Sequence, residues 1–343
     1  VVNDISIVSY DNDSFDESFQ QGTGYLVSYE TETTANLKGT INNSTNVEFP
    51  ITYNADNHWS NFLLLENPFS FDISWNNFTK HNVVDGIAKI NTDGTYNYDI
   101  INDIKVGEGF MIKTMGENPS LTYNIDSRSD YNNDSYRYIN VMASGNEGGD
   151  NIIINFSDEK REGYPKLDNI NKNAALLYLL ENNCRYGINT YNNDIKEIPL
   201  YFDAKKMGTY TFTFDVNGEF ENLYLVDKMT GEKVNILMEN EYTFTSMSKD
   251  NPNRFFLTIS HGDGIDDDDE NFAYVSDGDI IIYNINGEAQ INIFDALGRC
   301  VYKGTSSDDI NRISVATLRS GVYMIQKVDD DGVKVQKIMN YIF

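Results

Sequence analysis

The C-terminal stretch AQINIFDALGRCVYKGTSSDDINRISVATLRSGVYMIQKVDDDGVKVQKIMNYIF, residues 289–343, decides the fold class. Two strand-like runs, 291–294 and 300–303, flank a turn that contains Leu297, Gly298 and Arg299. Short β-prone runs separated by a glycine-containing turn predict a β-hairpin, and Gly298 permits the positive φ that a tight turn needs. A second hairpin is predicted from LRSGVYMIQ and VKVQKIM, which flank residues 329–332. The segment is therefore predicted to be a small antiparallel β-domain.

The core of this domain is expected to come from apolar strand positions, namely Ile291, Ile293, Val301, Tyr323 and Val335. Gly321 stands at a predicted strand start, where we expect it to allow a close approach of the backbone. The run 322–325 carries apolar residues on both faces, which predicts a central strand and leaves its register open.

Three short motifs occur in order within the domain: a D-x-x-G-R turn, an S-G-x-Y strand and a closing K-I pair. Their residues are Asp295, Gly298, Arg299, Ser320, Gly321, Tyr323, Lys337 and Ile338. This order resembles the C-terminal sorting domain of the type IX (Por) secretion system of Bacteroidetes. The resemblance implies a seven-stranded immunoglobulin-like β-sandwich that the outer-membrane secretion machinery recognises. It also implies a secreted or cell-surface protein.

The composition narrows the classes of partner. The chain of 343 residues has 26 Lys and Arg against 53 Asp and Glu, a formal charge of −27, which repels phosphate backbones, so no nucleic-acid partner is expected. The 23 Tyr and 19 Phe favour strands. No apolar run approaches the roughly 20 residues that span a bilayer, so no transmembrane segment is expected. Cys184 and Cys300 lack C-x-x-C spacing and are expected to be buried or isolated thiols.

The remainder of the chain is predicted to form two further β-domains, so the fold class is all-β with tandem antiparallel β-sandwiches. We place an N-terminal β-domain at 1–130, a central β-sandwich at 131–262, an acidic linker at 263–272 and the sorting-type sandwich at 273–343. In the central domain, LVDKMTGEKV predicts a hairpin that reverses at Thr230 and Gly231. The run AALLYLLENN has no decisive period; a strand is preferred over a short helix.

The two upstream domains also carry motifs that resemble modules preceding sorting domains in large Bacteroidetes surface proteins. In the first domain these are Gly22, Gly24, Tyr25, Leu26, Tyr29, Leu37, Gly39, Asn42, Trp59, Asn61, Leu63, Asn67, Pro68, Phe69, Gly107, Gly109, Phe110 and Lys113. In the central domain they are I-P-L, L-Y-L-x-D-x-x-T-G and a closing R-F-x-L. The resemblance implies non-catalytic β-modules downstream of a protease, hydrolase or adhesin portion, and it places both Trp59 and Trp75 inside the first domain.

Sites for chemistry are weakly indicated. The histidines, His58, His81 and His261, lie in no nucleophile signature with Cys184, so no enzymatic activity is expected. No cofactor is expected either. Asp263, Asp266 and Asp268 supply hard oxygen ligands beside flexible glycines and form a candidate calcium site, although a solvated linker is the preferred interpretation.

We therefore expect a non-catalytic C-terminal region of a secreted or cell-surface protein, with spacer or adhesion modules ahead of a sorting and anchoring domain. The alternative is a carbohydrate-binding accessory region of a secreted protease or glycoside hydrolase. The expected partners are the outer-membrane secretion machinery and, for the upstream modules, a host or matrix protein or a glycan.

Overall fold

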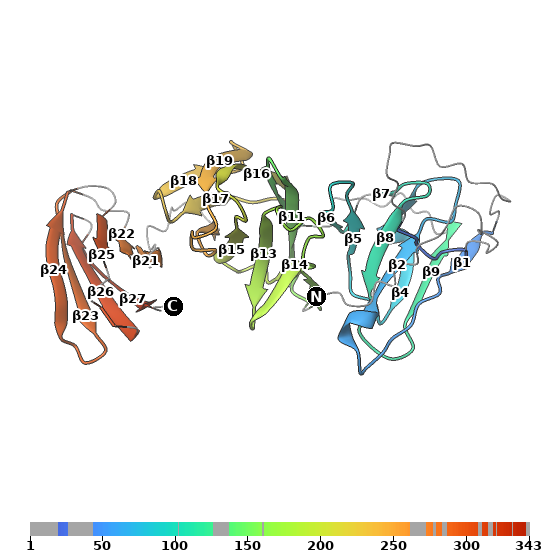
Figure 1. The fold of residues 1–343 in the computed structure, drawn as a ribbon, viewed down its shortest axis with the longest axis horizontal. Helices are drawn as coiled ribbons and strands as arrows, with labels where there is room; N and C mark the ends of the chain where they lie inside the picture. The colour runs from blue at the N-terminus through green and yellow to red at the C-terminus, as the bar shows by residue number, and fades with distance from the viewer. Residues whose placement is uncertain are drawn as a thin grey trace. The chain divides into compact units, whose positions relative to one another are not determined.

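The computed structural model describes residues 20–26, 44–101, 103–125, 137–159, 161–260, 272–276, 279–282, 287–307, 311–314, 318–319, 321–330 and 332–340. These residues form strands β1 to β27, two short 3₁₀ helices and no α-helix, which confirms the predicted all-β class (Figure 1). The chain divides into two compact units. Unit 1 comprises Val1–Ile139, Asn151–Asn171 and Arg185–Asn192, and unit 2 comprises Asn140–Asp150, Lys172–Cys184 and Asn193–Phe343. The domain boundaries expected from the sequence stay predictions.

Unit 1 is built from short antiparallel strands. They are β1 (Asn46–Glu48), β2 (Phe62–Glu66), β3 (Ile73–Ser74), β4 (Phe78–His81), β5 (Ile87–Ile90), β6 (Tyr96–Asp99), β7 (Asp103–Ile104), β8 (Gly109–Lys113), β9 (Ser120–Asn124) and β12 (Tyr164–Pro165). The 3₁₀ helices are η1 (His58–Asn61) and η2 (Trp75–Asn77). Sheet β2-β8-β5-β6 and sheet β1-β9-β4 share one core, in which Trp75, Phe78 and Phe110 meet. This arrangement is an antiparallel β-sandwich.

Three longer strands contribute residues to both units: β10 (Arg137–Gly145), β11 (Gly148–Phe156) and β14 (Cys184–Tyr191). Within unit 1, β11 and β14 pair in parallel, from Ile153 opposite Ile188 to Phe156 opposite Tyr191. This pair departs from the purely antiparallel expectation. The pairing fits the burial of β11, whose residues 150–156 are all buried, as suits a strand covered on both faces.

The central strands of unit 2 are β13 (Leu176–Glu181), β15 (Glu197–Asp203), β16 (Gly208–Asn217), β17 (Asn222–Asp227), β18 (Glu232–Asn235), β19 (Glu241–Ser246) and β20 (Phe255–Ser260). The run 176–181 is a strand, as preferred, and the hairpin β17–β18 reverses at Gly231 with a φ of 75°. Rings from four strands pack edge to face in the core, namely Phe202, Phe212, Phe244 and Phe255.

A buried ion pair lies beside this aromatic core. Arg254 donates from Nε to Asp227 Oδ1 at 2.7 Å and from Nη2 to Asp227 Oδ2 at 2.5 Å, with both side chains almost fully enclosed. Burial lowers the pKa of Arg254, but Asp227 outweighs burial and the net shift is upward. Tyr242 donates to the same carboxylate at 2.9 Å. The ion pair therefore links the end of β17, at Asp227, to Arg254, the residue immediately before β20.

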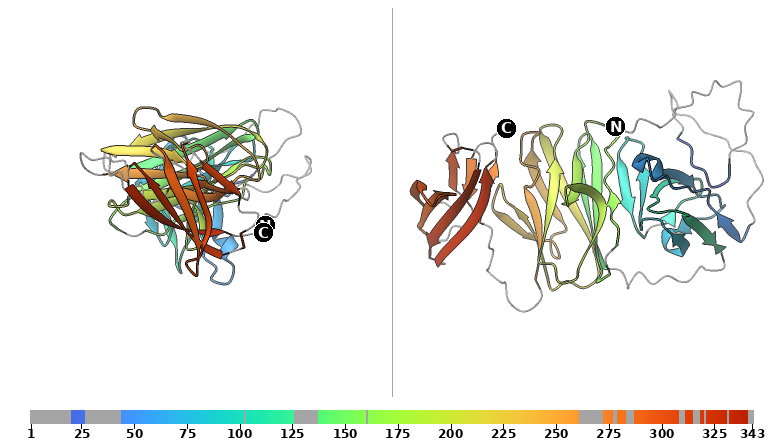
Figure 2. Two further views of the ribbon diagram at one scale, coloured as in Figure 1. Left: turned by 90° about the vertical axis from the view of Figure 1, so that its left-hand side faces the viewer. Right: turned by 90° about the horizontal axis from the view of Figure 1, so that it is seen from below.

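The terminal module of unit 2 contains the last seven strands: β21 (Ala273–Ser276), β22 (Asp279–Ile282), β23 (Ala289–Asp295), β24 (Cys300–Ser306), β25 (Asn311–Ser314), β26 (Gly321–Asp329) and β27 (Gly332–Asn340). They form sheets β21-β22-β25 and β24-β23-β26-β27, the orange and red strands of Figures 1 and 2. Isoleucines from both sheets build one core. Both predicted hairpins are present. The finer immunoglobulin-like assignment stays a prediction.

Candidate functional site

The predicted turn of the sorting-type motif is a compact, self-bonded loop. Gly298 N donates to Asp295 O at 2.9 Å, and Gly298 has a φ of +76°, as predicted. Asp295 Oδ1 accepts from Leu297 N at 2.9 Å and from Arg299 N at 3.0 Å. Arg299 Nε donates to Asp295 Oδ2 at 2.7 Å, and these bonds from Arg299 lower the pKa of Asp295. The aspartate thus fixes the backbone of the turn and orients the arginine.

The three motifs, although far apart in sequence, meet in one row across the sheet. Asp295 on β23 is the register partner of Tyr323 on β26, and Tyr323 is the partner of Ile338 on β27. Tyr323 and Ile338 are buried at 6% and 7% exposure. The Tyr323 hydroxyl donates to Arg319 O at 2.8 Å, which holds the chain that enters β26. The row therefore joins a turn, a strand start and a strand end.

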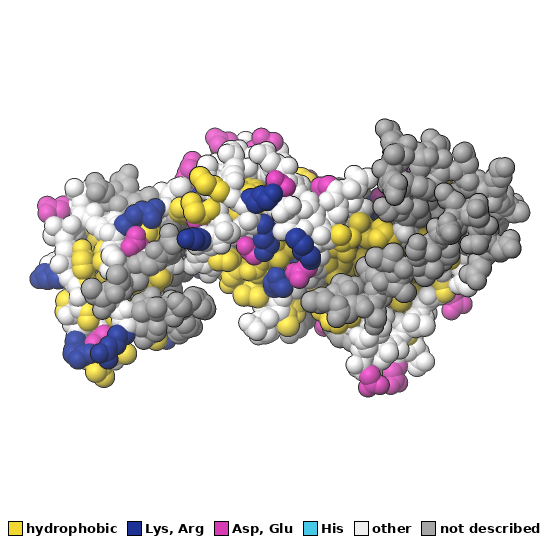
Figure 3. All heavy atoms as spheres, viewed as in Figure 1, with side chains coloured by type: hydrophobic (Ala, Val, Ile, Leu, Met, Phe, Trp, Pro, Cys, Tyr) yellow, Lys and Arg dark blue, Asp and Glu magenta, His cyan; other side chains and the backbone are white. Residues whose placement is uncertain are grey.

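The solvent side of the same end carries mixed side chains. Lys337 is exposed on the outer face opposite Met324, which is 36% exposed. Leu297 at the turn is 79% exposed, and the Arg299 side chain is 73% exposed. Figure 3 shows basic, acidic and hydrophobic side chains together where β23 turns into β24, at the lower left. Of the predicted motif residues, Ser320 lies outside the described residues.

Gly321 differs from its expected role. It begins β26, as predicted, but a Cβ added there would meet no heavy atom within 4 Å. The expected close backbone approach is wrong. Because Gly321 lacks a positive φ as well, its position tolerates a side chain.

Two of the five expected core residues lie on the surface. Ile291, Ile293 and Tyr323 are buried, whereas Val301 is 40% exposed and Val335 is 52% exposed. Val301 falls at a register irregularity, because Phe294 pairs with Cys300 and Ile293 with Tyr302. Because of this bulge, Tyr302 takes the inward position in place of Val301 and packs on the core.

Sequence reasoning missed several polar side chains that form hydrogen bonds and an ion pair inside the module. On β27 the inward parity holds Gln336, whose Oε1 accepts from Phe272 N at 2.6 Å and from Ala273 N at 2.7 Å, while its Nε2 donates to Ala273 O at 2.6 Å. Lys327 and Asp329 form a buried ion pair at 2.8 Å. For Gln336 the sequence signal was its two-residue spacing from Ile338 on the same strand, which is obscured because Val333 and Val335 occupy the alternate positions of β27.

The remaining predicted sites divide between the surface and undescribed residues. Asp263, Asp266 and Asp268, the candidate calcium ligands, lie outside the described residues. Trp75 is fully buried, as expected, but Trp59 is 51% exposed, so its expected core position is wrong. Cys184 and Cys300 are free and exposed thiols, so neither is buried.

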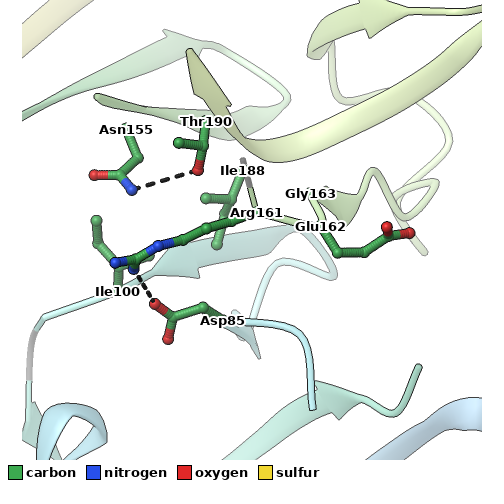
Figure 4. A pocket seen from close by; sticks show the side chains of 8 residues that line it. All are labelled: Asp85, Ile100, Asn155, Arg161, Glu162, Gly163, Ile188 and Thr190. Carbon is green, nitrogen blue, oxygen red and sulfur yellow. Dashed lines mark hydrogen bonds and ion pairs between the residues drawn. The ribbon is translucent and has the colours of Figure 1, made fainter. Parts of the chain in front are cut away.

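Side chains that line a small hollow in unit 1 form hydrogen bonds and an ion pair within the protein (Figure 4). Asp85 Oδ1 accepts from Trp75 Nε1 and from Lys80 Nζ, each at 3.0 Å, and Asp85 Oδ2 accepts from Arg161 at 3.2 Å. Burial raises the pKa of Asp85, but these three donors outweigh it and the net shift is downward. The carboxylate is ionised and engaged, which suits a structural cross-link better than a general base. The hollow is lined by Asp85, Ile100, Asn155, Arg161, Glu162, Gly163, Ile188 and Thr190.

Comparison with protein families assigns the C-terminal part of the chain. Residues 251–340 match the secretion system C-terminal sorting domain. All eight predicted motif residues fall inside this match, which begins before β20 and so extends upstream of the predicted sorting module. The match confirms the resemblance to type IX sorting domains, and the upstream β-structure is consistent with it.

A type IX sorting domain marks a protein that this secretion system exports. The chain is accordingly a secreted or cell-surface protein, as predicted, and the secretion machinery is its partner. The part of the chain that the structure describes has no helix with the length and apolar character to cross a membrane. Neither the comparison with curated proteins nor that with solved structures found a match.

Proposed function

We propose that the end of the sorting domain formed by the Asp295–Arg299 turn, Tyr323, Lys337 and Ile338 is the face that the export machinery binds. The observation that carries this proposal is the shared register row, because it gathers three separate sequence motifs on one end of one sheet. Buried Tyr323 and Ile338 hold the row in place. Exposed Leu297, Arg299 and Lys337 supply the apolar contact and positive charge that a partner can use.

The test is an export assay with charge-reversal variants. The full chain, placed behind a general secretory signal in a type IX-competent host, is followed by surface protease access and immunoblotting of cell fractions. Arg299→Glu combined with Lys337→Glu is expected to leave the protein folded and retained in the periplasm. Arg312→Glu changes the charge of an exposed residue on β25, in the other sheet, and is expected to be exported normally.

Two outcomes contradict the assignment of this face. Normal export of the Arg299 and Lys337 variant would remove it from the recognition surface. Equal retention of the Arg312 variant would mean that overall charge, not the motif end, controls export.

We further propose that the upstream β-sandwich structure is a non-catalytic spacer or adhesion region. Its support is the sandwich architecture and the engagement of Asp85 with three donors in the hollow of unit 1. A hydrolase would instead need a carboxylate positioned toward a substrate cleft.

A second candidate function is favoured by one observation. Trp59 is 51% exposed in unit 1, and an exposed aromatic ring can stack on the apolar face of a sugar ring. The carbohydrate-binding alternative is therefore kept beside the spacer proposal.

A further inference from the structure

Trp59 occupies an unusual position for a tryptophan. It lies on η1, the short helical turn immediately before β2 in Figure 1, and half of its surface is open to solvent. The second tryptophan, Trp75, has no exposed surface. A flat apolar ring with this much exposed surface offers an area that a ligand can cover.

The Trp59 ring is backed by a series of aromatic side chains that leads into the core. It stacks on Phe62 with ring centroids 5.9 Å apart and planes inclined by 28°. Phe62 meets Tyr164 edge to face at 6.0 Å, and Tyr164 meets Tyr98 edge to face at 5.8 Å. Tyr164 and Tyr98 are buried. The indole thus has support against the interior of unit 1.

Asparagine side chains fix the backbone that presents Trp59. Asn54 Oδ1 accepts from Asp56 N at 2.9 Å and from Asn57 N at 3.2 Å, and Asn57 Oδ1 accepts from Trp59 N at 3.1 Å. Buried Asn61 accepts from Asn54 N at 2.7 Å and donates to Asn54 O at 3.0 Å. Because the loop is already ordered, a ligand would lose little free energy to ordering it.

The exposed polar residues next to Trp59 in sequence belong to the same turn. Asn54, Asp56, Asn57 and Ser60 are all exposed. The oxygens of Asn54 and Asn57 hold the backbone, while their amide nitrogens have no hydrogen-bond partner within the described residues. Asp56 adds an acceptor. The centre of a protein–protein contact is instead depleted of charge and excludes water.

We infer that Trp59 is the stacking platform of a saccharide-binding site. A pyranose has an apolar C–H face that fits a flat indole, and it carries hydroxyls around its edge that fit a rim of amide donors and a carboxylate acceptor. The inference rests on the second candidate function above and does not depend on the sorting face. It names the ligand class as a neutral, pyranose-based polysaccharide.

The experiment is affinity electrophoresis of the full chain through native gels, each containing a soluble β-glucan, a xylan or a galactomannan. At least one polysaccharide is expected to retard the wild type, and Trp59→Ala is expected to weaken that binding by about tenfold or more. Met115→Ala, which truncates another exposed apolar residue of unit 1 at 45% exposure, serves as the matched control and is expected to bind like the wild type.

Tryptophan fluorescence gives a second readout. Since Trp75 is buried, the retarding polysaccharide is expected to shift the emission of Trp59 to the blue and to shield it from acrylamide, with no such response in Trp59→Ala. Circular dichroism of the variant checks that it is folded.

Three results would overturn the inference: no retardation of the wild type by any of these polysaccharides, equal retardation of Trp59→Ala, or a Trp59-dependent dimer in sedimentation with no sugar bound. Export of Trp59→Ala is expected to remain normal. A loss of sugar binding with intact export, or the reverse, therefore separates this site from the sorting face.

Discussion

The register of the sorting domain predicts opposite outcomes for two apolar residues on neighbouring strands. Ile325 lies on the inner face of β26 with no exposed surface, opposite Ile293 and Gln336. Val335 lies on the outer face of β27 at 52% exposure. Ile325→Ala removes three carbon atoms, which is about 2.4 kcal/mol at about 0.8 kcal/mol per methylene group. A cavity contribution of about 1 kcal/mol brings the loss of unfolding free energy to roughly 3 kcal/mol. Val335→Ala is expected to change it by about 0.5 kcal/mol or less.

Hydrogen exchange of the full chain, read by mass spectrometry on peptides from 321–329 and 332–340, measures both effects locally. A loss of roughly 3 kcal/mol is expected to speed exchange in these strands by about a hundredfold for Ile325→Ala, while Val335→Ala exchanges like the wild type. Peptides from β16 and β19 provide the internal reference. Faster exchange in Val335→Ala than in Ile325→Ala would show that the valines face inward and would refute the register.

Three further perturbations follow from the described contacts. Gly187→Ala is expected to destabilise unit 1 by about 1–3 kcal/mol, because an added Cβ would lie 2.3 Å from the ring of buried Tyr98, whereas Gly321→Val is expected to be nearly neutral; urea unfolding compares them. Arg254→Met leaves a buried carboxylate without its cation, so a loss of about 3–5 kcal/mol is expected in the same assay, and an unchanged midpoint would contradict the burial of the pair. The lowered pKa of Asp85 means that its stabilising contribution is present above the unfolded value of 3.8 and is lost as the pH falls through the lower folded value. Below about pH 4, unit 1 of the wild type should therefore lose more stability than unit 1 of the Asp85→Asn variant. The emission of buried Trp75 during urea titrations follows the unfolding of both proteins. Equal losses in the two proteins would exclude this linkage.

The features that depend on local chemistry were predictable from sequence. The turn at Gly298 and the reversal at Gly231 need residues that adopt a positive φ, and both have one. The strand assignment of 176–181 was also correct, because a short apolar run fits a strand better than a helix of two turns.

The features that depend on tertiary pairing were not predictable. The closing strand carries apolar residues on both parities, so period two alone could not say whether Val335 or Gln336 faces inward. Trp59 and Trp75 lie in similar sequence surroundings, yet the asparagine-capped turn exposes the first. The parallel pairing of β11 and β14 joins segments that no short-range pattern connects.

The row that links Asp295, Tyr323 and Ile338 has a consequence for when the export signal exists. Each member belongs to a different strand, so an unfolded chain contains all three residues but does not bring them together. The proposed export signal is therefore conformational, and the export machinery would bind it only after the domain has folded. A protein whose last strand, β27, has not paired with β26 would not be exported. Recognition would therefore also select for correct folding.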